Sequence, residues 1–296
     1  MKTIRPGYLA LVLVVALPGA TPRLLAQDSD ALLQRGIYAV GKHDATTAIL
    51  EFTRVIALDS QNAVAYQNRA EAYQDKGEYD KAIADYDAAL EIDPKYVDAL
   101  CNRSFAYQLK GDNDRALADA DQAIQIAPQN AGTYNIRGLT YVAMGKFDEA
   151  IADFSQALQI DPKFAMAYIN RGDACAKKGL PGLADINFDQ ALQLDPDDAE
   201  IYNDVAWSMA TSPPAGNHDS QKTMEYATKA CELSDWLEPN YIDTLAAAYA
   251  DAGDFDNAVK WENHYLQTPH LGASLISDAQ KRLDLYKAHK PYRETK

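Results

Sequence analysis

Apolar and small residues in the segment 131–164 recur at the spacing of two amphipathic helices joined by a short turn. Residues three or four positions apart share one face of each helix: Tyr134, Gly138 and Tyr141 in the first, and Ala150, Phe154 and Ala157 in the second. Gly145 suits the left-handed turn between the helices, and Pro162 ends the second helix. The pattern predicts a helical hairpin.

The hairpin pattern returns every 34 residues, most visibly in the evenly spaced prolines Pro94, Pro128, Pro162 and Pro196. Aligned on these prolines, the chain divides into five repeats at 29–62, 63–96, 97–130, 131–164 and 165–198. Each resembles the tetratricopeptide repeat, which pairs small and aromatic residues on two helices, here named A and B. The resemblance implies an all-α fold, a right-handed superhelix (α-solenoid) of about seven helix-turn-helix repeats with a C-terminal capping helix.

Residues 199–296 keep the pattern in altered form. We expect two divergent repeats over 199–272 with an insertion at 211–220, where Pro213 and Pro214 exclude a helix. Residues 273–296 then form the capping helix and a polar tail. The stretch 203–294, with DTLAAAYADAGDFDNAVKW and KPYRE, is similar to a C-terminal module of exported bacterial tetratricopeptide proteins.

Two positions of each repeat are small throughout the chain. Position 8 carries Gly36, Ala70, Ser104, Gly138, Gly172, Ala206 and Ala246, and position 20 carries Ala48, Ala82, Ala116, Ala150, Ala184, Thr223 and Ala258. Small residues at these places let helix A and helix B of one repeat approach closely.

Position 7 is arginine in five successive repeats: Arg35, Arg69, Arg103, Arg137 and Arg171. Position 23 of the same repeats carries Glu51, Asp85, Asp119, Asp153 and Asn187. Because helices A and B lie side by side, we predict partly buried structural ion pairs of Arg69 with Asp85, Arg103 with Asp119 and Arg137 with Asp153. The rival interpretation is a basic binding stripe, but position 7 points inward in this repeat pattern.

Asparagine recurs on the face that helix A is expected to turn toward the concave groove. Position 6 carries Asn68, Asn102 and Asn170, and Asn135 and Asn203 lie one position earlier in their repeats. A side-chain amide offers a donor and an acceptor to a peptide group. The pattern resembles the asparagine ladder with which some tetratricopeptide proteins hold an extended backbone. A tolerated polar surface, or shared ancestry of the repeats, explains the recurrence equally well.

Large apolar residues lie between these amides. Phe105, Leu139 and Trp207 fall on groove positions, where they either anchor a bound segment or pack against the next helix A. The carboxylate clamp of this family uses Lys at position 5 and Asn at position 9, and no Lys stands at either position here. We therefore do not expect the protein to bind the C-terminal carboxylate of a partner through such a clamp.

Residues 1–26 have the features of an export signal. Lys2 and Arg5 precede the apolar run 9–17, and Ala26 fits the residue before cleavage. The run is too short to cross a bilayer, so we expect no membrane span after cleavage and a periplasmic or secreted protein. Acidic residues outnumber basic ones 43 to 28, which disfavours nucleic acid and favours a basic partner.

No motif for catalysis, cofactor binding or metal binding stands out. The three cysteines, Cys101, Cys175 and Cys231, are expected to be free buried thiols, and the five histidines lack ligand spacing. The sequence predicts a scaffold or adaptor that is not an enzyme and binds a protein or peptide in its groove. The alternative is an accessory subunit for a carbohydrate polymer or an envelope export or assembly machine. An enzyme would need a pocket under the insertion, near His218.

Overall fold

The computed structural model describes residues 22–211, 219–269 and 271–293, and within these ranges the chain forms fifteen α-helices and no strand. The predicted all-α helical repeat fold is therefore confirmed. Residues 1–21 of the predicted export signal, and 212–218 of the predicted insertion with His218, lie outside the described residues. The expected cleavage point after Ala26 falls within the first helix.

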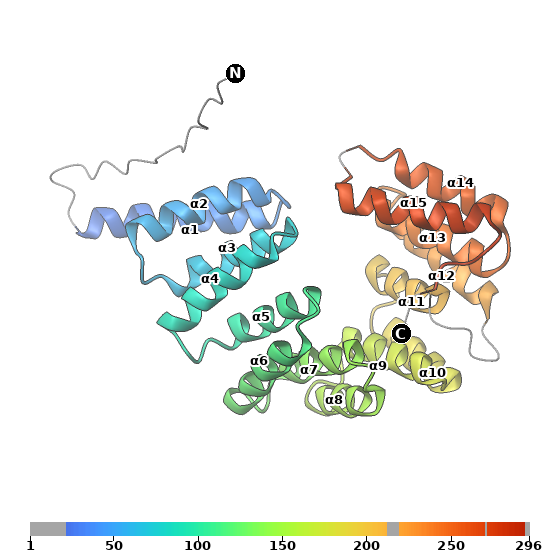
Figure 1. Cartoon of the computed structure of the whole chain (residues 1–296), viewed down its shortest axis with the longest axis horizontal. Coiled ribbons are helices and arrows are strands. Elements are labelled where there is room, and N and C mark those ends of the chain that lie inside the picture. The colour runs from blue at the N-terminus through green and yellow to red at the C-terminus, as the bar shows by residue number, and fades with distance from the viewer. Residues whose placement is uncertain (1–21, 212–218, 270, 294–296) are drawn as a thin grey trace, which may run out of the picture. The chain divides into compact units, whose positions relative to one another are not determined.

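The chain divides into two compact units, and the first ends at Asp112. Its helices are α1 (Pro22–Val40), α2 (Ala45–Leu58), α3 (Ala63–Asp75), α4 (Tyr79–Ile92) and α5 (Val97–Leu109). Each helix of this unit packs against the next along the chain, and α3 also contacts α1 and α5 (Figure 1). A helices therefore meet both their own B helix and neighbouring A helices.

The second unit begins at Asn113 and holds ten helices in its described part. They are α6 (Asn113–Ile126), α7 (Ala131–Ala143), α8 (Phe147–Ile160), α9 (Ala165–Lys178), α10 (Pro181–Leu194), α11 (Ala199–Thr211), α12 (Ser220–Leu233), α13 (Pro239–Asp251), α14 (Phe255–Leu266) and α15 (Ala273–Lys287). Successive helices again lie side by side, and α9 also contacts α7 and α11 (Figure 1). The last helix, α15, packs on α14.

Helix starts follow the period of the sequence through the middle of the chain. The helices α3, α5, α7, α9 and α11 begin at Ala63, Val97, Ala131, Ala165 and Ala199, one every 34 residues. The next odd-numbered helix, α13, begins 40 residues after α11, at Pro239. Odd-numbered helices are thus the A helices, and even-numbered ones up to α14 are the B helices.

The small residues at position 8 make room for an aromatic ring of the same repeat. A methyl group built on Gly138 would lie 2.5 Å from the Phe154 ring, and one on Gly172 would lie 2.5 Å from Phe188. Both rings are buried, and so is the alanine at position 20, as at Ala150. The close approach of helices A and B therefore depends on the glycine at position 8, which leaves space, as much as on the aromatic ring that fills this space.

The turn after helix A uses the left-handed region of backbone space. Gly77, Gly145 and Gly179 have φ values of 72°, 71° and 86°. The first repeat places His43 at this position, and it takes the same region with φ 55°. A side chain there costs roughly 1 kcal/mol, so the first repeat is locally strained where the others are not.

The ring–glycine contact gives a direct test of the packing. We expect Gly138→Ala to lower the free energy of unfolding by roughly 1–3 kcal/mol, because its methyl group overlaps the buried Phe154 ring. The matched control is Gly182→Ala in α10, where nothing lies within 4 Å, and we expect it to raise stability by roughly 0.4–1 kcal/mol. Urea denaturation measures both. Equal effects of the two changes would show that Gly138 is not needed for packing.

Candidate functional site

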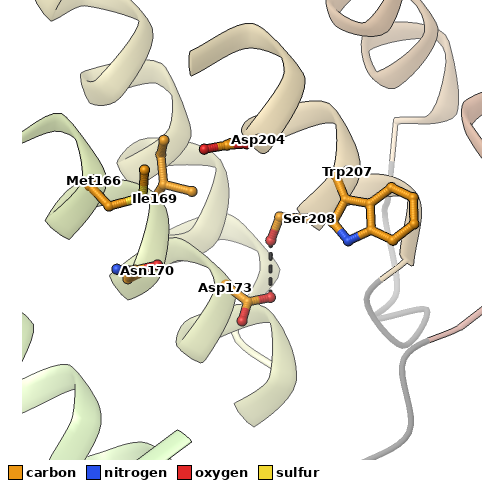
Figure 2. Close-up of a pocket in the computed structure, with 7 residues that line it drawn as sticks. All are labelled: Met166, Ile169, Asn170, Asp173, Asp204, Trp207 and Ser208. Atoms are coloured by element: carbon orange, nitrogen blue, oxygen red, sulfur yellow. Dashed lines mark hydrogen bonds between the residues drawn. The ribbon is translucent and has the colours of Figure 1, made fainter. Parts of the chain in front are cut away.

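Two residues predicted for the groove, Asn170 and Trp207, line one pocket in the second unit (Figure 2). The pocket lies between two successive A helices and has a volume of about 170 Å³. Its lining consists of Met166, Ile169, Asn170 and Asp173 from α9, and Asp204, Trp207 and Ser208 from α11. Apolar and acidic groups thus face the same space, and polar groups of this kind can fix the orientation of a ligand.

Asp173 ties the two walls of the pocket together. Its Oδ1 accepts a hydrogen bond of 3.0 Å from Ser208 Oγ on α11, drawn in Figure 2. Its Oδ2 lies 2.8 Å from Lys177 Nζ, one turn further along α9. The negative charge of Asp173 is therefore balanced within the protein.

Asp204 differs, because the described residues supply it with no salt bridge. Figure 2 shows its carboxylate pointing from α11 toward α9. The contact that it does make is weak, a 3.3 Å bond from the Asn203 side-chain amide. Burial raises the pKa of Asp204 to about 6. The sequence analysis missed Asp204, although it holds position 6, the position of Asn68, Asn102 and Asn170.

Trp207 lies at the margin of the pocket and is held from its other side. The Arg282 guanidinium lies 5.7 Å from the indole, and the Tyr292 ring lies 6.1 Å from it. Arg282 is itself bound by Asp243, at 2.8 Å, and Glu262, at 3.2 Å. Burial raises the pKa of Asp243, and burial with the neighbouring Asp243 raises that of Glu262 to about 9. Arg282 thus lies between two buried carboxyl groups, and its positive charge opposes the effect of burial on both.

Residues 291–293, which the sequence analysis places in a polar tail, lie against the second unit. Arg293 Nη2 is 2.6 Å from Asp251 Oδ1, and Nη1 donates to the Ala210 carbonyl at the end of α11. Tyr292 packs beside the buried Tyr286. The end of the described chain therefore supports α11, the helix that carries Asp204 and Trp207.

The predicted asparagine ladder uses its amide donors inside the protein. Asn68 Nδ2 donates to a carbonyl of its own helix, and Asn102 Nδ2 donates to Glu71 across the neighbouring A helices at 2.7 Å. Asn170 Nδ2 donates to Asn135 Oδ1 at 2.9 Å. Because Asn135 is only 6% exposed, it positions Asn170 instead of facing a ligand. The Oδ1 atoms of Asn102 and Asn170 remain as acceptors.

The other predicted apolar groove residues are half-buried. Phe105 lies on α5 in the first unit, where it retains part of its exposure. Leu139 packs against a cluster that includes Phe154 and Ala174, so part of its surface serves the contact between α7 and α9. Trp207 is the predicted apolar groove residue that lines a pocket.

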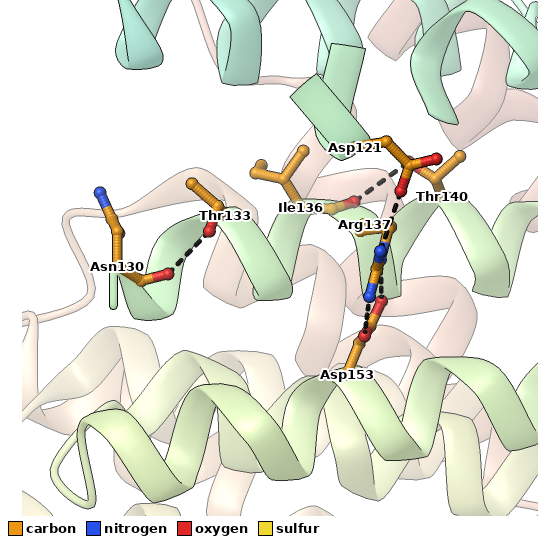
Figure 3. Close-up of polar contacts among 7 residues, drawn as sticks. All are labelled: Asp121, Asn130, Thr133, Ile136, Arg137, Thr140 and Asp153. Atoms are coloured by element: carbon orange, nitrogen blue, oxygen red, sulfur yellow. Dashed lines mark hydrogen bonds and ion pairs between the residues drawn. The ribbon is translucent and has the colours of Figure 1, made fainter. Parts of the chain in front are cut away.

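Arg137 links three helices of the second unit (Figure 3). Its Nε and Nη2 donate to the two oxygens of Asp153 at 2.7 and 2.8 Å, and its Nη1 donates to Asp121 at 2.9 Å. Tyr134 and Tyr141 flank the guanidinium at 5.9 and 5.8 Å. The fork geometry of arginine suits this arrangement, in which Asp153 is nearly buried.

The other position-7 arginines repeat this arrangement within each unit. In the first unit, Arg69 holds Asp85 through two bonds of 2.7 Å and reaches Thr53 at 3.1 Å. Arg103 Nη1 donates to Asp87 at 2.6 Å. Asp119, its predicted partner, is a buried residue of α6 in the second unit.

The fifth repeat and the first complete the series. Arg171 binds Asn187 at 2.7 Å and Ser155 at 3.1 Å. The first repeat is weaker, because Arg35 is 4.0 Å from Glu51 and its side chain is 62% exposed.

Four of the five position-7 arginines bind a side chain of the preceding repeat, a contact that the sequence analysis missed. Thr53, Asp87, Asp121 and Ser155 lie 16 residues before Arg69, Arg103, Arg137 and Arg171. They share position 25 of the preceding repeat, so the signal was the same 34-residue period that placed the arginines. The guanidinium groups of Arg69, Arg137 and Arg171 thus each join their own B helix to the preceding B helix, which opposes separation of neighbouring repeats.

Family models match the repeats seen in the structure. A model described as TPR repeat matches residues 72–111 and 138–179. Models described as tetratricopeptide repeat match residues 51–84, and 97–130 with 165–198. The sequence has no significant match among curated proteins.

Solved structures share the fold. A tetratricopeptide repeat protein from Parabacteroides merdae is 17% identical, with a TM-score of 0.59 over 88% of this chain and 99% of its own. PilW, titled a widely conserved type IV pilus biogenesis factor, is 24% identical, with a TM-score of 0.54 over 73% of this chain and 97% of its own. A chain of the APC/C hetero-tetramer Cut9–Hcn1 is 19% identical, with a TM-score of 0.58 over 76% of this chain and 46% of its own. These likenesses show an all-α helical repeat.

Metal ligands, membrane-spanning helices and reactive cysteines are the other features of the described residues that bear on function. No group of three or more His, Cys, Asp or Glu side chains there is arranged to hold a metal ion. No helix there is both long and apolar enough to cross a membrane. None of the three cysteines forms a disulfide within the described residues. Cys175 and Cys231 are buried as expected, whereas Cys101 is only half-buried, and burial raises the pKa of Cys231 to about 12.

The raised pKa of Asp204 predicts how stability depends on pH. Its folded-state pKa of about 6 exceeds the ordinary value of 3.8, so the folded state binds the proton more tightly than the unfolded state. The stability that this proton binding contributes is fully present below the unfolded-state pKa of Asp204. It is lost as the pH rises through the folded-state pKa. We expect Asp204→Asn to gain roughly 1–3 kcal/mol relative to wild type between about pH 4 and pH 7.

Urea denaturation across this pH range measures the effect. The matched control is Glu225→Gln, which removes an exposed charge from the neighbouring helix α12 and should follow wild type. A difference between Asp204→Asn and wild type that does not change with pH would contradict the assignment.

Proposed function

Because the chain belongs to the tetratricopeptide repeat family, we propose that it is a non-catalytic scaffold that binds an extended segment of another protein along its A helices. Tetratricopeptide repeats and the shared fold support a protein-interaction scaffold in general terms. The finer proposal concerns where the segment binds and which chemistry it carries.

The observation that carries the proposal is the pocket between α9 and α11. It opens between neighbouring A helices, is large enough for a side chain, and combines the Trp207 indole with the polar groups of Asn170 and Asp204. Truncation of a tryptophan in such a setting commonly costs more than about 1 kcal/mol of binding energy. This combination fits an anchor residue of a bound segment better than it fits solvent-exposed helix surface.

The amides give the segment a backbone contact. Asn102 and Asn170 donate inside the protein, so their Oδ1 atoms are oriented acceptors on the A-helix face of their own unit. In our proposal these acceptors receive backbone N–H groups of the extended segment. The asparagine ladder predicted from the sequence thus remains part of the proposal, but Asn135 holds Asn170 in place and does not itself contact the segment.

The expected partner is basic. The chain has a formal net charge of −15, and Arg69, Arg137 and Arg171 are bound to side chains of the protein itself. Of the two carboxylates that line the pocket, Asp173 is paired with Lys177, and Asp204 has no salt bridge within the described residues. Electrostatic complementarity of this kind speeds association and selects against acidic partners.

The proposed location is outside the cytoplasm, in the periplasm or secreted. It rests on Lys2, Arg5, the apolar run 9–17 and Ala26. Cleavage after Ala26 would remove only the first turn of α1 and leave its buried residue Leu32 in place.

A second candidate is binding of a carbohydrate polymer, and one observation favours it. Trp236 stacks on Trp261 with ring centroids 5.3 Å apart, and 41% of Trp236 is exposed. Exposed aromatic faces are typical of sugar-binding surfaces, and Trp236 is held in a strained backbone with φ 61°. A glycan array with wild type and Trp236→Ala tests this candidate.

Site-specific photo-crosslinking tests the main proposal. A benzophenone amino acid replaces Phe105, Leu139 or Trp207 on the A helices, or Ile186 on the outer face of α10 as the matched exposed control, and the probe is a pool of random extended peptides. We expect crosslinks from the A-helix positions and not from Ile186. We also expect Trp207→Ala to weaken peptide binding by about tenfold or more, with Ile186→Ala unchanged.

Thermal melts of each variant separate lost binding from lost folding. Equal crosslinking at Ile186 and the A-helix positions would move the site away from the A helices. Absence of crosslinks at all positions would contradict the proposed function.

A further inference from the structure

We propose that the pocket between α9 and α11 is a specificity pocket for one cationic side chain, lysine or arginine, of the bound segment. The inference rests on the proposed function and adds to it the chemistry of the anchor residue. It is carried by the size of the pocket, its two kinds of wall, and the state of its two carboxylates.

The size of the pocket fits one side chain. Its volume of about 170 Å³ is close to that of an engineered cavity of about 150 Å³ that holds one benzene molecule. The opening lies between two A helices, so a residue of a segment lying along this face can enter without unfolding either helix. A whole folded domain or a long acyl chain would not fit.

The apolar wall suits the stem of a long basic side chain. Met166 and Ile169 form one side of the pocket, and Met166 keeps 37% of its surface exposed. Trp207 lies on α11 at the edge of the pocket, apart from the other lining side chains. Lysine and arginine bury their methylene groups against such surfaces while the charged end stays with polar partners. A thioether also adapts its shape to different occupants.

The polar wall supplies one uncompensated carboxylate. Asp173 is bound by Lys177 and Ser208, so it has little need of a further cation. Asp204 points into the same space and has no salt bridge within the described part of the chain. A carboxylate withdrawn from water is stabilised strongly by a cation that arrives with a ligand.

Comparable carboxylates elsewhere in the fold show what Asp204 lacks. Asp85, Asp153 and Asp243 are as buried or more so, and each is bound to an arginine of this chain. The sixth repeat has Val205 at position 7, where the preceding five have arginine, and Lys222 goes to Asp189 instead. Asp204 therefore lacks the basic partner that these other buried carboxylates have.

The other charged and titratable groups around Asp204 reinforce this preference. Asp198 and Glu200 precede it on and before α11, Asp173 with Lys177 faces it from α9, and Tyr241 lies near it on α13. Three of these are acids, and the lysine among them is already paired. A neutral or acidic side chain would leave Asp204 without a counterion, and an acidic one would add repulsion.

The first experiment measures the pocket by itself. The carboxyl-carbon resonance of Asp204 in the full chain is followed by NMR during titration with Nα-acetyl-lysine methylamide, the arginine analogue, and the uncharged norleucine analogue. We expect the lysine and arginine compounds to shift this resonance and to lower the pKa of Asp204, and norleucine to do neither. Equal effects of lysine and norleucine, or no shift with either cation, would overturn the proposal.

The second experiment separates this inference from the proposed function. Random peptides are selected by display on wild type, on Asp204→Asn, and on Glu225→Gln as the charge-matched control outside the pocket. We expect one enriched lysine or arginine position on wild type and on Glu225→Gln, and its loss on Asp204→Asn with affinity at least about tenfold lower.

The possible outcomes point to different failures. Peptides that bind wild type without any enriched basic residue would overturn the specificity pocket and leave the scaffold standing. Failure of all peptides to bind would contradict the proposed scaffold function. The NMR titration of Asp204 would then show whether the pocket binds a cationic side chain. Melts of Asp204→Asn should show no loss of stability, because the change removes an unpaired charge.

Discussion

The contact between an arginine and a buried carboxylate of the same repeat is the interaction on which the rest of the structure depends. Helices A and B come close because Gly138 or its equivalents leave space for a ring, and this closeness buries Asp153. A buried carboxylate is costly unless a cation reaches it, and Arg137 does so with two bonds. Its third bond, to Asp121, joins the preceding repeat. Stable packing and the stacking of repeats thus share one side chain.

This use of arginine also shapes the surface available for binding. Arginines that could have formed a basic stripe are bound internally, so the A-helix face presents amide oxygens, apolar groups and carboxylates. The sixth repeat lacks the arginine, and near that break in the pattern the pocket with Asp204 opens. We propose that recognition takes place at this pocket, and that basic extended segments are the partners that fit its distribution of charge.

Much of the fold could be predicted from the sequence, because the 34-residue period fixes helix starts such as Ala131 and Ala165 to the residue. The same period placed Arg137 opposite Asp153. It did not reveal Asp121, because the prediction compared positions within one repeat only. Asp204 was missed because asparagine, and not the position it occupies, was taken as the signal. The contact of Arg293 with Asp251 joins residues 42 positions apart outside the period, and no local pattern encodes it.

The most direct test of this account is a double-mutant cycle between repeats at Asp121 and Arg137. The unfolding free energies of Asp121→Ala, Arg137→Met, the double variant and wild type give the coupling energy of the pair. If the arginine holds neighbouring repeats together, the coupling is favourable by roughly 0.5–3 kcal/mol, and Arg137→Met lowers stability while peptide binding by the folded protein is retained. A coupling near zero, with unchanged stability and lost peptide binding in Arg137→Met, would show that the arginines serve a ligand and would contradict the account.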